Sequence, residues 1–168
     1  MFNIYSADVT GNPGNCSYPH KHVILDEDSL KAAICHDYVC AEYKNSYRNG
    51  DNFIGSDCLP VDCDNDHSEN PDDWVTPDDI MQAFPGVSFA IHYSRYNNRA
   101  KNGKAARPKF HVLFPIEYVS DASLYSDMKK LVNSIFPYFD TQALDAARFF
   151  FGTATADVAL YPGRMNLT

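Results

Sequence analysis

The chain has 168 residues, of which 45% are apolar and 21% are charged, and its formal net charge is −8. This length and composition predict a single globular domain over residues 1–168 and exclude wholesale disorder, a collagen-like chain and a coiled-coil rod. No apolar run approaches the roughly 18 residues that a membrane span needs, and the first residues show no signal-peptide pattern. We therefore expect a cytoplasmic protein without a membrane partner.

Charge is distributed unevenly along the chain. Nine acidic residues and no Lys or Arg lie between Asp57 and Asp79, whereas six basic residues and no acid lie between Arg95 and Lys109. A negative net charge argues against strong binding of nucleic acid. Two adjacent blocks of opposite charge nevertheless favour a site that holds a metal ion and phosphates.

The five cysteines predict reduced thiols, because their number is odd and a domain of this size does not need disulfides. The closest approach to a zinc motif is formed by Cys16, His20 and His22, which lack a second pair of ligands.

The first 25 residues are rich in Asn, Gly, Pro and Tyr and predict loops or short extended pieces. A helix capped by Asp26 or Asp28 is expected to run to about Tyr43, since apolar residues recur at helical spacing. The run 58–64 predicts a strand that ends in acids, with Pro60 near its start.

Thr76 predicts the start of a short helix, because a hydroxyl cap is followed by Pro and two acids. Residues 87–93 and 109–114 predict two strands, which the long basic loop 95–108 joins as a hairpin.

A longer helix is expected over residues 120–136, because Pro137 prevents it from continuing. A strand is expected over residues 148–151. Five apolar residues predict the buried face of the helix: Leu124, Met128, Leu131, Val132 and Ile135. Helices and strands in mixed order around a hairpin predict an α+β fold.

Asp62 and Asp64 carry the most chemical information. Residues two apart on a strand face the same side, and two carboxylates there repel each other unless a cation lies between them. Mg²⁺ or Mn²⁺ with substrate phosphates fits that role, as in two-metal phosphoryl transfer. The alternative is a pair of exposed loop acids. A calcium loop is disfavoured, because His67 and Asp73 replace the Gly and Glu that it requires.

Lys109 and His111 share one face of the predicted strand 109–114, and Arg107 extends the row. Cations in this arrangement bind a triphosphate, although an isolated His in an apolar run is also typical of a core.

Asp140, which follows Phe139 just beyond a helix, is a candidate third metal ligand, and Asp145 is an alternative candidate. Arg148 is a further candidate for a phosphate contact.

This ordered set resembles the archaeo-eukaryotic primase superfamily, the primase-polymerase catalytic module found in phage and plasmid primase-helicases. The family pattern is an apolar strand ending in D-x-D, a strand with x-x-H, and an apolar residue followed by Asp. The matching stretches here are 59–64, 109–111 and 139–140, supported by His92-Tyr93-Ser94-Arg95 and Ala147-Arg148-Phe149. The family often has Ser two residues before the His, where this chain has Lys109.

The resemblance implies a modified RRM-like sheet, antiparallel or mixed, with packed helices and a small N-terminal α/β unit. It implies that Asp62, Asp64 and Asp140 hold two divalent ions, Mg²⁺ or Mn²⁺. It also implies nucleotide binding by six residues: Ser94, Arg95, Arg107, Lys109, His111 and Arg148.

The activity that the resemblance implies is template-directed nucleotidyl transfer, as a DNA primase, a polymerase or both. The partners would be nucleoside triphosphates, a single-stranded DNA template bound weakly, and a helicase or accessory domain in a longer replication protein. Two alternatives stay open, a metal-dependent nuclease of the replication-initiator type and a non-catalytic nucleic-acid-binding module.

Overall fold

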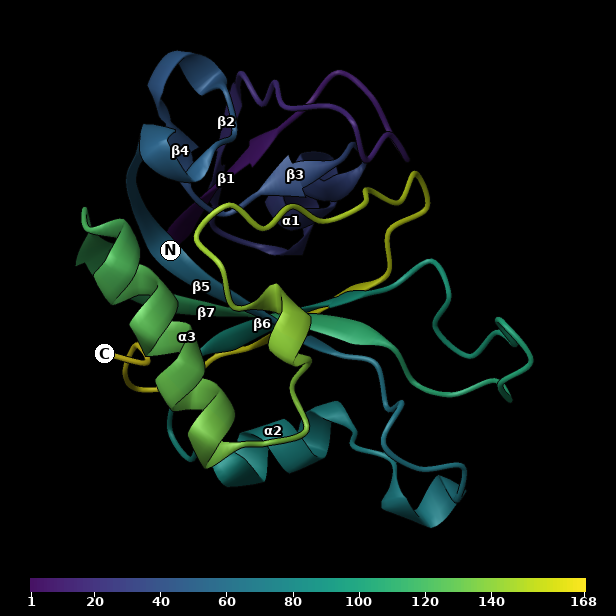
Figure 1. Ribbon diagram of the computed structural model, residues 1–168. Coiled ribbons are helices and arrows are strands. Elements are labelled where there is room, and N and C mark those ends of the chain that lie inside the picture. The colour runs from purple at the N-terminus through teal and green to yellow at the C-terminus, as the bar shows by residue number, and fades with distance from the viewer.

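A twisted antiparallel sheet of five strands forms the centre of the molecule (Figure 1). The computed structural model describes residues 1–168. In spatial order the strands are β4 (Glu42–Tyr43), β5 (Phe53–Cys63), β7 (Phe110–Val119), β6 (Phe89–Tyr93) and β8 (Val158–Tyr161).

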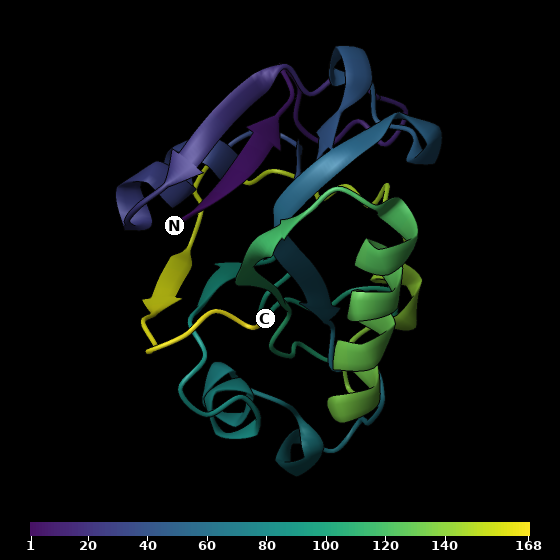
Figure 2. The same cartoon turned by 90° about the vertical axis from the view of Figure 1, so that its left-hand side faces the viewer.

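Two helices cover one face of this sheet. These are α2 (Pro77–Ala83) and α3 (Ala122–Ile135), which Figure 2 shows on the same side of the strands. The side chains of Leu59 and Val61 on β5, and of Val112 on β7, pack beneath them in the larger core.

The other face of the sheet packs against a small N-terminal α/β unit. Strands β1 (Phe2–Ser6), β2 (His20–Ile24) and β3 (Tyr38–Val39) form a three-stranded sheet, and helix α1 (Glu27–Ile34) lies beside it. Buried residues of this unit share a second core with Cys58, Ala90 and Leu113 of the central sheet. The α+β fold, the antiparallel sheet and the separate N-terminal unit are therefore confirmed.

Strand pleating decides which polar residues face the N-terminal unit. Asp62 lies two residues after Pro60 and four after Cys58, so it shares the face on which Cys58 packs against that unit. His111 shares the face of Leu113, and His92 shares the face of Ala90. Three polar side chains thus interrupt an otherwise apolar surface.

The predicted first helix begins correctly but is too long. Asp26 caps it through a capping box with Ser29, and it ends at Ile34 rather than near Tyr43. The buried Asp37 carboxylate accepts hydrogen bonds from the amides of Gly11, Asn12 and Gly152. These contacts turn the chain, and the residues that follow become β3 and β4, because strand pairing outweighs local helical spacing.

The predicted strand 58–64 is confirmed but begins five residues earlier, so Pro60 lies well inside it. Strand β4 pairs with β5 only at Phe53 and Gly55. The part of β5 around Pro60 therefore has an open edge, where the missing amide donor costs no ladder hydrogen bond.

The hairpin and the Thr76-capped helix are also confirmed. Strands β6 and β7 pair on either side of the basic loop, and β7 continues to Val119.

The predicted strand 148–151 is wrong: this segment makes a single bridge between Phe150 and Tyr38. Strand β8 was not predicted, and the segments that form β1 and β2 were expected only as loops or short extended pieces.

The buried face predicted for α3 is only partly right: Val132 is buried and Met128 packs against the core, but the other three residues do not. Leu124, Leu131 and Ile135 are 53%, 61% and 59% exposed, whereas Tyr125 and Lys129 are buried together with Val132. The Tyr125 hydroxyl donates to the carbonyl of Cys58 at 2.6 Å, and Lys129 Nζ donates to the carbonyl of Asp145 at 2.8 Å. These hydrogen bonds hold the face with Tyr125 and Lys129 against the core, so that three of the predicted apolar residues face solvent.

No helix combines the length and apolar character that crossing a bilayer requires. All five cysteines are free thiols.

Burial lowers the pKa of Lys129 to about 8 from its ordinary value of 10.5. Between these two values the unfolded chain binds more protons than the folded chain, so this lysine makes stability rise with pH, by about 1.4 kcal/mol per pH unit. In chemical denaturation at pH 8, 9 and 10, we expect the free energy of unfolding of wild type, relative to that of a Lys129→Met variant, to increase at each step. The exposed Lys130→Met variant is the control, and a constant gap between wild type and Lys129→Met would contradict this assignment.

Candidate functional site

The site is built on the register of three neighbouring strands. Asp62 on β5 lies directly opposite His111 on β7, and His111 lies directly opposite His92 on β6. All three side chains are on the face turned toward the N-terminal unit. Cross-strand neighbours are close enough for direct contact, so the register alone brings one carboxylate and two imidazoles together.

The Asp62 carboxylate is buried, with 5% of its side chain exposed, and has two partners. One oxygen is hydrogen bonded to His111 Nδ1, and the other lies 3.3 Å from an Arg148 guanidinium nitrogen. Burial by itself raises the pKa of Asp62, but His111 and Arg148 outweigh it and hold the pKa below its ordinary value. Asp62 therefore stays ionised inside the protein.

Asp64 follows the end of β5 and is more open, with 41% of its side chain exposed. Its nearest cation is Lys109, whose Nζ lies 3.9 Å away. Partial burial and the neighbouring charge of Asp62 raise the pKa of Asp64, although Lys109 and His111 oppose them. The pair thus has an excess of negative charge on the side of Asp64.

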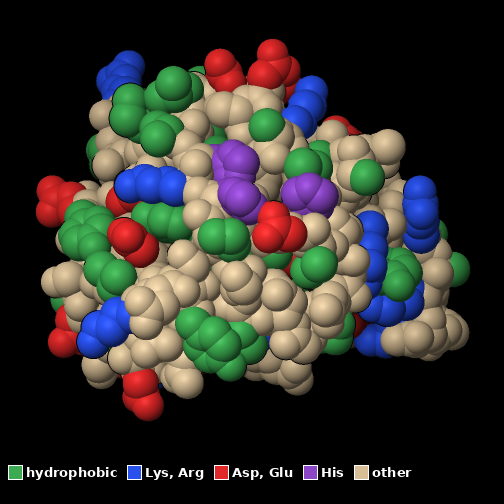
Figure 3. Space-filling view, turned by 90° about the horizontal axis from the view of Figure 1, so that it is seen from above, with side chains coloured by type: hydrophobic (Ala, Val, Ile, Leu, Met, Phe, Trp, Pro, Cys, Tyr) green, Lys and Arg blue, Asp and Glu red, His purple; other side chains and the backbone are tan.

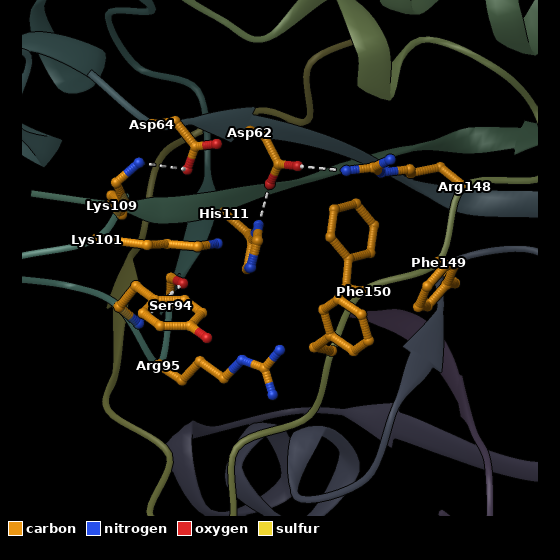
Figure 4. Close-up of a pocket in the computed structure, with 12 residues that line it drawn as sticks. Asp62, Asp64, Ser94, Arg95, Lys101, Lys109, His111, Arg148, Phe149 and Phe150 are labelled. Atoms are coloured by element: carbon orange, nitrogen blue, oxygen red, sulfur yellow. Dashed lines mark hydrogen bonds and ion pairs between the residues drawn. The ribbon is translucent and has the colours of Figure 1, made fainter. Parts of the chain in front are cut away.

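A pocket opens in front of these acids, and Figure 4 shows its side chains converging from the sheet, the basic loop and the C-terminal segment. The structure brings together seven of the nine residues singled out from the sequence. These are Asp62, Asp64, Ser94, Arg95, Lys109, His111 and Arg148.

The opposite wall of the pocket is basic and aromatic. Arg95 and Lys101 reach in from the loop, whereas Arg148 lies beside Asp62 and carries a buried Nε that has no hydrogen-bond partner. A buried donor without a partner is costly, and an anionic ligand would supply the missing acceptor. A pocket lined by both carboxylates and cations suits a metal-bound phosphate group.

His92 supports the site from behind. It is fully buried, with Nδ1 2.9 Å from the Tyr38 hydroxyl and Nε2 3.1 Å from the Thr153 hydroxyl. Burial and the neighbouring His111 lower the pKa of His92 well below its ordinary value. A neutral ring fixed at both nitrogens gives His111 a rigid neighbour.

Two of the singled-out residues lie outside the pocket. Arg107 is fully buried, pairs with Glu69 at 2.7 Å and donates to the carbonyls of Asn65 and Ser68. The Asp140 amide donates to the Asp62 carbonyl at 2.8 Å, but its carboxylate accepts from the amide of Gln142. Asp140 thus lies beside Asp62 along the backbone, while its side chain caps a short helix.

No three His, Cys, Asp or Glu side chains lie close enough together to hold a metal ion. Asp62 and Asp64 nevertheless offer the hard oxygen donors that Mg²⁺ and Mn²⁺ prefer, and such ions commonly take only one or two carboxylates plus water and phosphates. The donor set fits an ion that arrives with substrate, provided that Asp62 exchanges His111 or Arg148 for it.

The sequence reasoning missed part of the pocket wall. Lys101 was noted only as one base of the loop, and the pocket also includes Tyr96 and the aromatic run 149–151. The sequence did offer a signal for the aromatic residues, because Tyr96 directly follows Ser94-Arg95 and the run 149–151 directly follows Arg148.

This arrangement defines an α+β domain with paired carboxylates at the end of a central strand. Its fold is similar to a solved structure, the AEP domain (PP-N190) of the primase-polymerase (PrimPol) of cyanophage S-2L, with a TM-score of 0.51. The alignment covers 97% of this chain and 81% of that chain at 10% sequence identity, so the likeness concerns the fold. Searches of protein-family models and of curated proteins found no match.

The two carboxylates should have opposite effects on stability in metal-free buffer at neutral pH. Asp62→Asn leaves His111 and Arg148 without their anion, which costs about 2 kcal/mol or more, and the melting temperature should fall by several degrees. Asp64→Asn removes a charge that Asp62 repels, so the melting temperature should rise. Differential scanning calorimetry measures both. Equal shifts in the same direction would show that the two acids share one environment.

Proposed function

We propose that this protein is a template-directed nucleotidyltransferase that acts as a DNA primase, a polymerase or both. The observation that carries the proposal is the pocket itself, which Asp62 and Asp64 line together with Lys101, Lys109 and Arg148. The similarity of the fold to a primase-polymerase domain supports the same reaction class.

Asp62 and Asp64 would hold the divalent ions, Mg²⁺ or Mn²⁺. The ions would neutralise the substrate phosphates and activate the attacking hydroxyl. Asp140 is the proposed third carboxylate, since its backbone is hydrogen bonded to Asp62. Its side chain would first have to leave the amide of Gln142.

The triphosphate would bind between the acids and the basic wall. His111, Lys109 and Arg148 approach it from the sheet and the C-terminal segment, and Ser94 and Arg95 approach from the loop. Lys109 lies two residues before His111, where the primase superfamily that the sequence resembles often has Ser, and it can serve as a charged phosphate ligand. We assign Arg107 a supporting role, because it holds the segment 65–69 that follows the acids.

The proposed partners are nucleoside triphosphates and a single-stranded DNA template. A partner helicase remains a prediction from the sequence resemblance.

The direct test supplies labelled nucleotide, a primed single-stranded template and Mn²⁺. Wild type should extend the primer, whereas Asp62→Asn and Asp64→Asn should lose at least about a hundredfold in rate, because each removes a charge that binds the ions. The exposed Asp127→Asn variant on α3 is the matched control. Cleavage of the strand without extension would favour the nuclease, and neither reaction would favour a binding module. Near-normal extension by either site variant would refute the assignment of the metal ligands.

Nucleotide affinity tests the cationic wall. His111→Ala and Lys109→Ala should each weaken binding of a fluorescent nucleotide by roughly ten- to a hundredfold, because a charge-assisted hydrogen bond contributes about 1.5–3 kcal/mol. Lys130→Ala, an exposed lysine on α3, should leave binding unchanged. Unaltered affinity in both site variants would make His111 a core residue and limit Lys109 to its ion pairs with Asp64 and Asp66.

A further inference from the structure

A continuous row of cationic and aromatic side chains lies along the mouth of the pocket. Arg48 lies 4.8 Å from the ring centre of Phe149, and the rings of Phe149 and Phe151 are 5.2 Å apart. Arg95 lies 4.5 Å from the Phe151 ring and 5.2 Å from the Tyr96 ring. Lys101 completes the row 4.0 Å from the Tyr96 ring. We call these six side chains the aromatic–cation row: Arg48, Phe149, Phe151, Arg95, Tyr96 and Lys101.

Of the aromatic members of the row, Tyr96 and Phe151 lie outside the hydrophobic cores, and Phe149 is partly buried against the small core around Tyr18 and Tyr43. Phe150, between Phe149 and Phe151, is buried and stacks on Tyr38. Because the segment is extended at this point, its two neighbours project away from that core, and both remain partly exposed, as does Tyr96. The fold therefore keeps three aromatic rings partly exposed, with Phe149 beside Phe151 and with Arg95 between Phe151 and Tyr96.

The cations of the row are free of acidic partners. Arg48, Arg95 and Lys101 form no ion pair, whereas Lys104 and Lys109 from the same basic block both pair with Asp66. Figure 3 shows Lys and Arg side chains gathered beside hydrophobic ones at its right-hand edge, the side on which the loop 94–109 projects in Figure 1. Unneutralised cations interleaved with aromatic rings are the combination that binds single-stranded nucleic acid, through phosphate attraction and base stacking.

We propose that the aromatic–cation row is the track on which a single-stranded nucleic acid lies, with its bases stacked on Tyr96, Phe149 and Phe151. Five members of the row line the pocket, and Arg48 extends the row beyond it, so that five successive contacts of 4.0–5.2 Å connect the six side chains. One nucleobase covers about one ring, so a row of this length fits several consecutive nucleotides rather than one free nucleotide. Paired bases hide their faces within a duplex, which favours a single strand.

This inference rests on the proposed function for its biological meaning, since the strand would be the template, but its binding step can be measured separately. The probe is a fluorescent oligo-dT strand titrated by anisotropy in EDTA, without nucleotide. Tyr96→Leu, Phe149→Leu and Phe151→Leu keep apolar volume and remove the ring faces. Each should weaken binding by about fivefold or more, because stacking of a base on an aromatic side chain has that strength.

Two controls separate stacking from folding. Tyr118→Leu removes an exposed tyrosine at the far end of β7 and should leave affinity unchanged. Phe149→Trp, which offers a larger ring face than Phe, should bind at least as tightly as wild type. An abasic strand should bind wild type more weakly than oligo-dT does and should not distinguish wild type from the leucine variants.

Three outcomes would overturn the inference. They are unchanged oligo-dT affinity in all three leucine variants, equal binding of abasic and normal strands, and loss of affinity for a free fluorescent nucleotide in place of the strand. The proposed function is judged separately, by primer extension. A chain that binds oligo-dT through the row and incorporates no nucleotide would support this inference while refuting the proposed activity.

Discussion

The site depends on one buried carboxylate and the cations that keep it charged. Asp62 lies on a central strand where water does not solvate it, and an unpaired buried charge is strongly destabilising. The β5–β7 register supplies His111 as one partner, and the C-terminal segment supplies Arg148 as the other. A slip of one residue would turn Asp62 into the apolar core under α2 and α3, so the register of the sheet and the chemistry of the site stabilise each other.

The N-terminal unit holds Arg148, the second partner of the Asp62 carboxylate, in place. Tyr38 on β3 forms paired backbone hydrogen bonds with Phe150, and Asp37 accepts a hydrogen bond from the amide of Gly152. These bonds attach the segment after Arg148 to the N-terminal sheet. Tyr38 also fixes His92, which lies against His111. The unit therefore positions residues on both sides of the pocket, although it contributes no lining side chain itself.

Opposite charges near the pocket are partly cancelled, which explains how a chain of net charge −8 can present a basic surface. The acidic segment after β5 neutralises much of the basic loop, since Arg107 pairs with Glu69, and Lys104 and Lys109 pair with Asp66. Arg48, Arg95 and Lys101, which have no acidic partner, lie against aromatic rings instead. Local pairing, rather than the total charge, thus decides where the protein can attract an anionic ligand.

The sequence alone determined the α+β class, the hairpin, the capped starts of α1 and α2 and the residues that lie on one strand face, because these follow from local periodicity and capping chemistry. It also singled out most of the pocket, since Asp62, Lys109 and His111 are brought together by neighbouring strands. It could not show that α1 ends at Ile34, that α3 buries Lys129, or that Arg107 is enclosed by the segment 65–69. Those outcomes depend on strand pairing, on buried hydrogen bonds to distant carbonyls and on ion pairs across the fold, which only the tertiary structure decides.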